Sequence, residues 1–292
     1  MPETLRRRAE AALVAITIVW GSTFVMIKAA LEDASTLAFL AVRFSIAAVA
    51  LAVLFRRDLL SGEARSTRAG LIAGICLYVA YLLQTAGLRH TTASKSGFLT
   101  GLFVVLVPLL GAAVYRVWPR ARELAGAGAA TAGMALMTLE GDRLAIGKGD
   151  LLTVGCAAAF AAHILVLGHF ARDASLGRVA VVQIATAAVL CLATLWWFET
   201  PYFRHSPRLW VAAGVTGVVA TAVAFTVQTW AQKHTTANRA ALLFALEPVV
   251  AAATARVLLG EALGSRGIWG GALILAGVLL VESRPREGPK SR

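Results

Sequence analysis

The chain contains little charge for its length. Of its 292 residues only 15% are charged, whereas 58% are hydrophobic. A soluble globular domain typically has about 25% charged and 45–50% apolar residues. The apolar excess is larger than one buried core needs, so the composition predicts a protein whose solvent is largely lipid.

Cysteines and catalytic motifs are also scarce. Cys76, Cys156 and Cys191 each lie in an apolar stretch without a nearby partner, which argues against a disulfide framework or a zinc site. The sequence has no phosphate-binding loop ending in Lys-Ser/Thr, no His-Glu-x-x-His and no paired intramembrane aspartates. We therefore expect no cofactor, no metal, no direct use of ATP and no enzymatic activity.

Long apolar runs are abundant. Each is about twenty residues long, which is the length that crosses ~30 Å of hydrocarbon as a helix. The runs are continuous rather than alternating, which favours helices over barrel strands. We predict an all-α polytopic membrane protein with ten transmembrane helices. They cover residues 11–31, 36–56, 69–89, 96–115, 123–139, 150–171, 177–198, 209–231, 240–259 and 267–282.

The net charge of +12 is unevenly distributed. With ten spans, most of the 28 lysines and arginines fall on the side of the membrane that holds the N-terminal Arg6–Arg8. By the positive-inside rule, both termini are predicted to lie in the cytoplasm; the family resemblance given below implies a bacterial inner membrane. The basic charge is an orientation signal that also favours anionic lipid head groups, and we expect no nucleic-acid partner.

Two sequence segments occur twice. Gln84–Lys95 reads "QTAGLRHTTASK" and Gln228–Arg239 reads "QTWAQKHTTANR", while Leu31–Phe44 is similar to Ala171–Ile184. These matches divide the chain into residues 1–140 and 141–292, each with five predicted helices. Because five is odd, the halves would cross the membrane in opposite senses, as inverted-topology repeats do in many secondary transporters. A duplication without mechanistic meaning is the alternative.

Three motifs resemble a known family. They are "WGSTFVMIKAAL" at Trp20–Leu31, the stretch His90–Leu110, and "HTTANRAALLFALEPVVAAATARVLLGEAL" at His234–Leu263. The chain resembles the drug/metabolite transporter superfamily, in particular the bacterial ten-helix members built from two EamA-type repeats. The resemblance implies export of amino acids or related metabolites. The second half departs from it at Phe160–Leu165, where "FAAHIL" replaces "WGSTF".

Aromatic and polar residues recur every three or four positions in the third and eighth predicted helices, and so share one face. The repeat places Tyr81 on Phe225 and Gln84 on Gln228. We expect these faces to line a mid-membrane cavity for a small zwitterion, although packing between helices is the alternative. In the first and sixth predicted helices the repeat also places Trp20 on Phe160 and Thr23 on His163. The candidates are Trp20, Thr23, Tyr78, Tyr81, Gln84, Thr85, Phe160, His163, Phe225, Gln228 and Gln232.

Ionisable residues inside the predicted spans are functional candidates by default. Glu247 precedes Pro248, whose ring removes a backbone hydrogen bond, and Pro108 can provide a matching kink or hinge. Glu247 is either a proton-coupling acid or a structural one. Arg43 is a hydrogen-bond anchor or a contact for a substrate carboxylate, and we favour the anchor.

Small residues mark the fifth helix of each half, at Ala125–Gly133 and Gly270–Val278. They permit close backbone approach and suggest a tight scaffold or a homodimer interface, with ordinary membrane composition as the alternative. In the repeated turns, Thr, Ser and Asn are expected to cap the helices that follow.

The function that fits these features is a secondary transporter of small metabolites, amino acids including aromatic ones, working by alternating access. Its partners would be that substrate and membrane lipids. A membrane scaffold or lipid-translocating protein without small-molecule transport is the alternative, and an intramembrane enzyme fits less well because no catalytic set is present.

Overall fold

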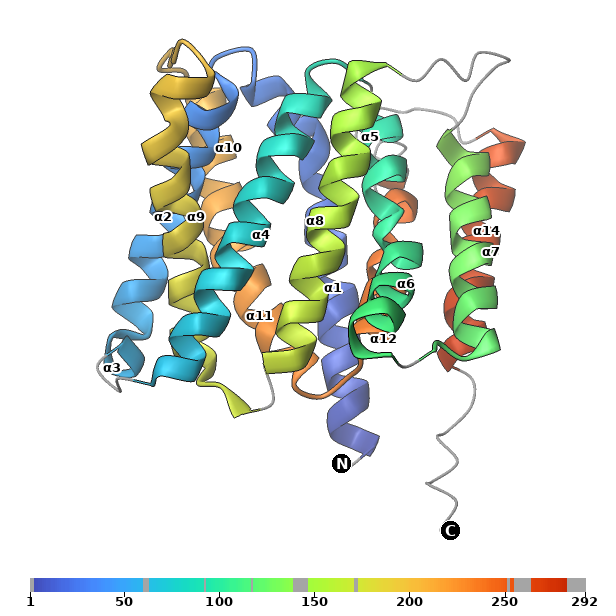
Figure 1. Ribbon diagram of the computed structural model, residues 1–292. Helices are drawn as coiled ribbons and strands as arrows, with labels where there is room; N and C mark the ends of the chain where they lie inside the picture. Colours follow the sequence, from blue (N-terminus) through green and yellow to red (C-terminus); the bar gives the residue numbers. More distant parts are fainter. Residues whose placement is uncertain are drawn as a thin grey trace.

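The structure is a computed structural model, and it describes residues 3–59, 63–91, 93–116, 118–138, 147–170, 173–250, 253–254 and 264–282. Nearly all of these residues are helical (Figure 1). Within the described ranges, the β pairing is limited to one isolated bridge between Ala34 and Phe203. The all-helical prediction is therefore confirmed for the described part of the chain.

The helices run roughly parallel to one another (Figure 1). In chain order they are α1 (Glu3–Ala30), α2 (Thr36–Leu54), α3 (Arg56–Leu59), α4 (Ala64–Leu88), α5 (Ala93–Gly101), α6 (Phe103–Tyr115), α7 (Ala121–Thr138), α8 (Lys148–Phe170), α9 (Leu176–Phe198), α10 (Pro207–Gly217), the π-helical turn η2 (Val218–Val223), α11 (Ala224–Gln232), α12 (Ala237–Phe244) and α14 (Ser265–Glu282).

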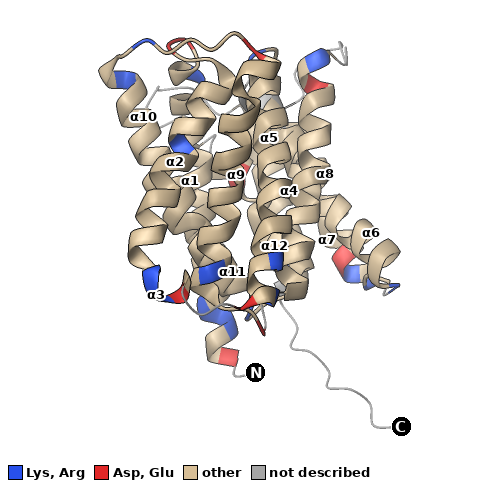
Figure 2. Ribbon diagram, turned by 60° about the vertical axis from the view of Figure 1, so that its left-hand side comes forward, with Lys and Arg blue, Asp and Glu red and all other residues tan. Residues whose placement is uncertain are grey.

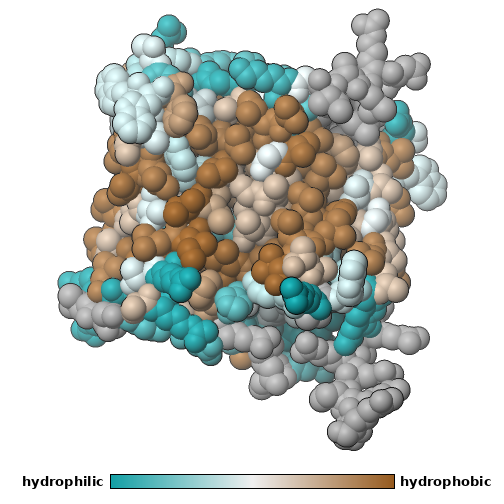
Figure 3. Space-filling model, in the orientation of Figure 1, coloured by the Kyte–Doolittle hydropathy of each residue, from teal (hydrophilic) through white to brown (hydrophobic). Residues whose placement is uncertain are grey.

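Seven helical stretches among the described residues are long and apolar enough to cross a membrane. They are α1, α2, α4, α5 with α6, α8, α9, and α10 with η2 and α11, and they coincide with seven of the predicted spans. Apolar side chains form a belt across the face shown in Figure 3, and most Lys, Arg, Asp and Glu residues gather at the two ends of the bundle (Figure 2). The chain is a multi-pass membrane protein.

The other three predicted spans have different outcomes. The span 123–139 is helical as α7, and the span 267–282 corresponds to the shorter apolar stretch Ser265–Val281 of α14. The span 240–259 begins in α12 and continues into residues that lie outside the described ranges. The predicted boundary between residues 140 and 141 also lies outside them. The count of ten helices stays a prediction.

The small residues of α7 and α14 face each other within the chain. A Cβ atom added at Gly126 would lie 2.9 Å from the backbone oxygen of Gly277, and one added at Gly133 would lie 2.5 Å from that of Gly270. No side chain fits at such distances, so the two backbones pack as closely as glycine allows. The predicted scaffold contact is therefore made inside one chain, and the homodimer interface stays a prediction.

Helices α2 and α9 pack side by side in opposite directions, and each begins where the other ends. Ser35, before α2, donates a hydrogen bond of 2.6 Å to Glu199, the residue after α9, and Glu199 also accepts from the Leu37 amide. Ser175, before α9, donates a hydrogen bond of 3.0 Å to Asp58 near the end of α2. An acid thus binds the start of the opposite helix at both ends of the pair.

The buried apolar residues form two large clusters. One is centred on α2, α4, α9 and α10, and the other on α6, α11, α12 and α14. Trp20 of α1 and Phe160 of α8 pack against both clusters. The polar residues between the clusters therefore sit in the middle of the bundle, where a cavity opens.

Candidate functional site

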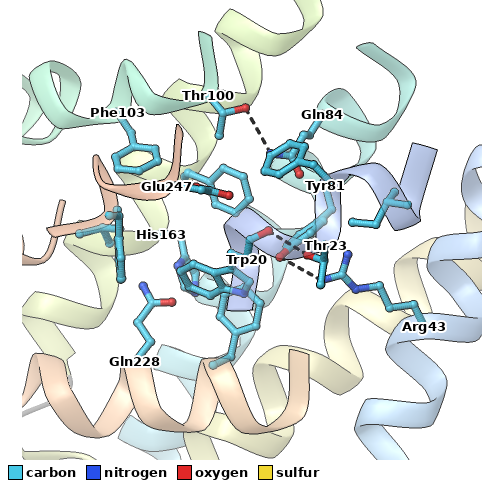
Figure 4. Close-up of a pocket in the computed structure, with 16 residues that line it drawn as sticks. Trp20, Thr23, Arg43, Tyr81, Gln84, Thr100, Phe103, His163, Gln228 and Glu247 are labelled. Atoms are coloured by element: carbon cyan, nitrogen blue, oxygen red, sulfur yellow. Dashed lines mark hydrogen bonds between the residues drawn. The ribbon is translucent and has the colours of Figure 1, made fainter. Parts of the chain in front are cut away.

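The central cavity lies between the two apolar clusters, near the middle of the long helices (Figure 4). Its volume is about 50 Å³, enough for roughly three or four water molecules. It is lined by Trp20, Thr23, Phe24, Ile27, Arg43, Tyr81, Gln84, Thr100, Phe103, Phe160, His163, Ile164, Phe225, Gln228, Phe244 and Glu247.

Most of the residues expected at a cavity do line this one. They are Trp20, Thr23, Tyr81, Gln84, Phe160, His163, Phe225, Gln228 and the acid Glu247. The aromatic residues pack edge to face: the ring centroids of Tyr81 and Phe160 are 5.3 Å apart, and those of Tyr81 and Phe225 are 6.1 Å apart. The two halves of the chain thus meet at this cavity through their aromatic rings.

Three expected residues do not line the cavity. The Tyr78 hydroxyl is hydrogen-bonded at 2.8 Å to Thr194 of α9, and Thr85 is buried among neighbouring helices. Gln232 donates to the backbone oxygen of Ile164 at 2.9 Å, near the end of α11. Helical spacing predicts which face of a helix a residue occupies. It does not fix the depth of these residues along the axis, and their polar groups pair elsewhere.

Glu247 reaches the cavity because the chain breaks just before it. Helix α12 ends at Phe244, four residues ahead of Pro248, and the ring of a proline is incompatible with a helical bond to that carbonyl. After a turn at 245–246 the helix resumes at 247. Gly21 of α1 packs on the new segment, where a Cβ atom would lie 2.8 Å from the Glu247 backbone oxygen. Pro108 instead lies inside α6, after the interruption at Leu102.

Glu247 is the sole carboxylate among the residues that line the cavity. In the described part of the chain its side chain has neither an ion pair nor a hydrogen bond. Removing an ionised carboxylate from water without a partner is costly. The position of Glu247 therefore favours either a bound cationic group or protonation.

Arg43 brings a positive charge to the same cavity. Its side chain is only 1% exposed, donates to the Thr221 hydroxyl at 2.8 Å and to the Tyr81 hydroxyl at 3.3 Å, and lies 4.6 Å from the Tyr81 ring centroid. These partners are neutral, so no carboxylate among the described residues balances the charge. Arg43 is an anchor and a cavity residue at once. The sequence favoured the anchor and did not place Arg43 among the cavity candidates.

One of the two partners of Arg43 lies on an irregular segment. Thr221 belongs to the π-helical turn η2, where its hydroxyl also donates to the Thr216 backbone oxygen at 2.7 Å. The backbone oxygen of Ala220, in the same turn, accepts the Trp20 indole N–H at 2.8 Å. Single π-helical turns are often found at functional sites. Here one such turn positions two of the side chains that line the cavity.

A network of hydrogen bonds between uncharged side chains supports His163 at the cavity wall. Gln183 donates to Thr229 at 3.0 Å, so its oxygen accepts from Nε2 of His163, also at 3.0 Å. This assignment leaves Nδ1 of His163 as an acceptor. Neither that atom nor Oε1 of Gln228 has a hydrogen-bond partner in the described structure, and both residues line the cavity.

Several lining residues were missed by the sequence analysis, among them Thr100 and Phe244. Thr100 accepts a hydrogen bond of 3.2 Å from Gln84. Phe244 packs on Trp20 with ring centroids 5.2 Å apart. The repeat could have identified them as a matched pair, because Thr100 follows His90 at the same spacing as Phe244 follows His234.

Known proteins resemble this chain along nearly its whole length. A protein of Archaeoglobus fulgidus named "uncharacterized transporter" is 32% identical over 279 residues, which cover 96% of this chain and 87% of that protein. A second protein with the same name and organism is 39% identical over 82 residues, 27% of this chain and 30% of its own.

Similarity of fold extends to the solved structures. One, described only as a crystal structure of a protein, superposes with a TM-score of 0.76 at 20% identity and covers 94% of this chain and 96% of its own. The model of the EamA-like transporter family matches this chain twice, at residues 7–139 and 147–283. The chain is thus a membrane transporter that belongs to the EamA-like transporter family, within the drug/metabolite transporter superfamily.

Proposed function

We propose that this protein is a secondary transporter of small zwitterionic metabolites, in particular amino acids with aromatic or other apolar side chains. It would act by alternating access in the inner membrane. One observation carries the proposal. A cavity in the middle of the bundle combines a buried arginine, a carboxylate that has no partner among the described residues, and a wall of aromatic rings.

The two charges are complementary to an amino acid. Arg43 and Glu247 enter the cavity from different helical segments (Figure 4). A guanidinium binds a carboxylate strongly through charge-assisted hydrogen bonds, and a carboxylate does the same for an ammonium group. Because each charge lies in a low-dielectric environment and has no ion pair with a described residue, a zwitterion would balance both.

The aromatic wall suits an apolar side chain. Trp20 packs on Phe225 at 5.4 Å between ring centroids and on Phe244 at 5.2 Å, so flat rings surround the polar groups. The present volume of about 50 Å³ is smaller than an aromatic amino acid, so helices must separate for it to bind. Alternating access would provide that opening at each membrane face in turn.

An inverted repeat of residues 1–140 and 141–292, ten helices and cytoplasmic termini are part of the proposal. Two observations support it. The family model matches the two halves separately. The α2–α9 pair is held by similar serine–acid contacts at both ends, Ser35 with Glu199 and Ser175 with Asp58. Two similar halves of opposite orientation would provide two similar states, one open to each side.

Glu247 also offers a route for coupling. If the transporter uses a proton gradient, the proton would bind Glu247, because the cavity has no other carboxylate in the described structure. The proton and the substrate ammonium group would then compete for one site. That competition is the basis of exchange, and without it the protein would be a facilitator that exports down a gradient.

Counterflow in proteoliposomes tests the substrate class. Vesicles loaded with unlabelled phenylalanine, phenethylamine or 3-phenylpropionate are diluted into labelled phenylalanine. We expect transient accumulation only with phenylalanine inside, because only the zwitterion meets both charges. Equal counterflow with the amine or the acid would contradict the zwitterion site.

Two further outcomes decide among functions. Scrambling of fluorescent phospholipids without amino-acid counterflow would favour a lipid-translocating protein. Absence of both activities in monodisperse reconstituted protein would favour a scaffold.

A further inference from the structure

A second cavity lies far from the first, at the end of the bundle where α1 begins and α14 ends. Its volume is about 640 Å³, and five of the side chains that line it are basic. We call it the basic cleft. Its lining residues are Arg6, Trp118, Pro119, Arg120, Arg122, Glu123, Lys233, His234, Thr235, Thr236, Asn238, Arg239 and Val281.

Part of this positive charge is already used inside the protein. Arg239 forms an ion pair of 3.0 Å with Glu10, and Lys233 donates to the backbone oxygen of Ala174 at 2.6 Å. Arg120 and Arg122 differ, because neither side chain has an ion pair with a described residue. The one lining carboxylate, Glu123, accepts from Asn238 at 2.9 Å and from the backbone N–H of Arg120 at 3.2 Å. Two arginines thus remain available to an anion.

Two helices begin at the basic cleft. Helix α7 starts at Ala121, between Arg120 and Arg122, and α12 starts at Ala237, where Thr236 caps it by accepting from the Arg239 amide. The N-terminal end of a helix carries partial positive charge and free N–H groups, which favour bound phosphate. The helix ends therefore add to the field of the arginines.

An apolar seam leads away from the basic cleft into the bundle. It shares Glu123, Asn238 and Val281 with the cleft and continues between Val104, Pro108, Ala127 and Leu242. The seam separates the closely packed α7–α14 pair from α6 and α12. At the mouth of the cleft Trp118 is 81% exposed, as tryptophans are at membrane–water boundaries. A charged site joined to an apolar seam suits an amphiphile better than a soluble ion.

We propose that the basic cleft binds the phosphate head group of an anionic phospholipid, with Arg120 and Arg122 as its main contacts. The acyl chains lie on the adjoining apolar belt, against α7 and α14, because the seam itself, about 10 Å³ in volume, is too small to hold them. Basic pockets between transmembrane helices are known to hold anionic head groups. The inference is independent of the transported substrate, and it assigns α7 and α14 a lipid-facing role beside the central cavity.

Native mass spectrometry of the full-length protein in detergent tests this site. Phosphatidylglycerol and phosphatidylcholine with the same acyl chains are titrated separately. We expect wild-type protein to prefer phosphatidylglycerol, and the Arg120→Gln/Arg122→Gln variant to bind it about 25-fold more weakly, at about fivefold per charge. The matched control is Arg56→Gln/Arg57→Gln, which removes two exposed arginines of α3 outside the cleft. It should retain wild-type binding.

Other outcomes would contradict the binding site itself, or would show that the bound phosphate does not come from a lipid. An equal loss in the α3 control would reduce the effect to general surface charge. Equal binding of the two lipids would exclude an anionic head-group site. In a parallel arm, millimolar inorganic phosphate is titrated without lipid and as a competitor. Binding of phosphate together with failure of phosphatidylglycerol to bind would assign the cleft to a soluble phosphate instead.

Discussion

Arg43 in α2 and Gln183 in α9 occupy the same position in two similar stretches of sequence, but they make different environments. Arg43 lines the central cavity and binds hydroxyl groups of Thr221 and Tyr81. Gln183 is fully buried, does not line the cavity and joins His163 to Thr229. One half of the chain delivers charge to the cavity, while the matching place in the other half supplies neutral support.

The aromatic residues beside Arg43 and His163 also differ between the two halves. Tyr81 faces Arg43 and its hydroxyl accepts from the guanidinium, whereas Phe225, its counterpart in the repeat, has no hydroxyl and packs on His163 at 5.6 Å. A buried cation needs acceptors around it, and a neutral glutamine network does not. Arg43 therefore brings a charge to the cavity at a position where the two similar stretches of sequence differ.

The largest expected effect comes from removing the charge of Arg43. We expect Arg43→Gln to lower phenylalanine counterflow by about 100-fold, since losing one partner of a buried charge contact costs about 2–5 kcal/mol. Glutamine can still donate to Thr221, so the protein should stay monodisperse. Arg65→Gln, which breaks an exposed ion pair with Asp173, is the control and should stay within about twofold of wild type. Wild-type counterflow in Arg43→Gln would remove Arg43 from the site.

The second effect concerns Glu247. We expect Glu247→Gln to weaken the apparent affinity for phenylalanine about tenfold, because a hydrogen bond to a charged group contributes about 1.5–3 kcal/mol. Uptake is measured with and without a pH gradient across the vesicle. If wild type responds to the gradient and Glu247→Gln does not, Glu247 binds the coupling proton. An unchanged response in the variant would exclude that role. The control for surface charge is Glu32→Gln, which removes an exposed ion pair with Arg208.

A third, smaller effect should appear in stability rather than in transport. Gln183→Leu leaves His163 and Thr229 without their partner, and a buried unpaired polar group costs about 1–3 kcal/mol. We expect a lower melting temperature in detergent, with counterflow per folded molecule within about threefold of wild type. Arg43→Gln, at the matching position, should instead lower counterflow strongly and leave the protein folded. A loss of counterflow in Gln183→Leu as large as in Arg43→Gln would show that the two positions are functionally equivalent.

The smallest effect compares Asp33 and Asp173, which are also matched by the repeat. Hydrogen bonds from Ser206 and Arg208 hold the pKa of the Asp33 carboxyl below its ordinary value, whereas Asp173 has an exposed ion pair with Arg65. A lowered folded-state pKa stabilises the protein above the unfolded-state pKa of about 3.9, and this stabilisation is lost as the pH falls through the lowered value.

Melting temperatures at pH 7 and in acid test this comparison. Asp33→Asn should melt slightly below wild type at pH 7, and the difference should shrink as the pH falls below about 4. Asp173→Asn should match wild type throughout, since exposed ion pairs contribute little. An equal decrease in both variants at pH 7 would show that the two loops are alike in stability.

Much of the site was predictable because helical spacing and the repeat act together. Tyr81, Gln84, Phe225 and Gln228 were placed on facing surfaces by their period and by their matching positions, and they line the cavity. Tyr78 and Gln232 obey the same period but bind Thr194 and the Ile164 carbonyl. A period gives the angle around a helix, while depth depends on where neighbouring helices cross it.

Other parts of the structure carry no clear sequence signal. The π-helical turn at Val218–Val223 reads as an ordinary apolar helix, yet its Thr221 and Ala220 position Arg43 and Trp20. The basic cleft gathers Arg120 and Arg239 from segments that are more than a hundred residues apart. Neither local composition nor spacing determines which loops meet at one end of a bundle.

The sequence alone determined that this is a helical membrane protein, because hydrocarbon demands long apolar helices, and its duplicated segments predicted two similar halves. Only the tertiary structure decided which buried polar groups pair with one another and which face the central cavity. Both Arg43 and Gln183 are polar residues inside spans, and their roles differ because the helices around them offer hydroxyl acceptors and open space to one and a closed neutral network to the other.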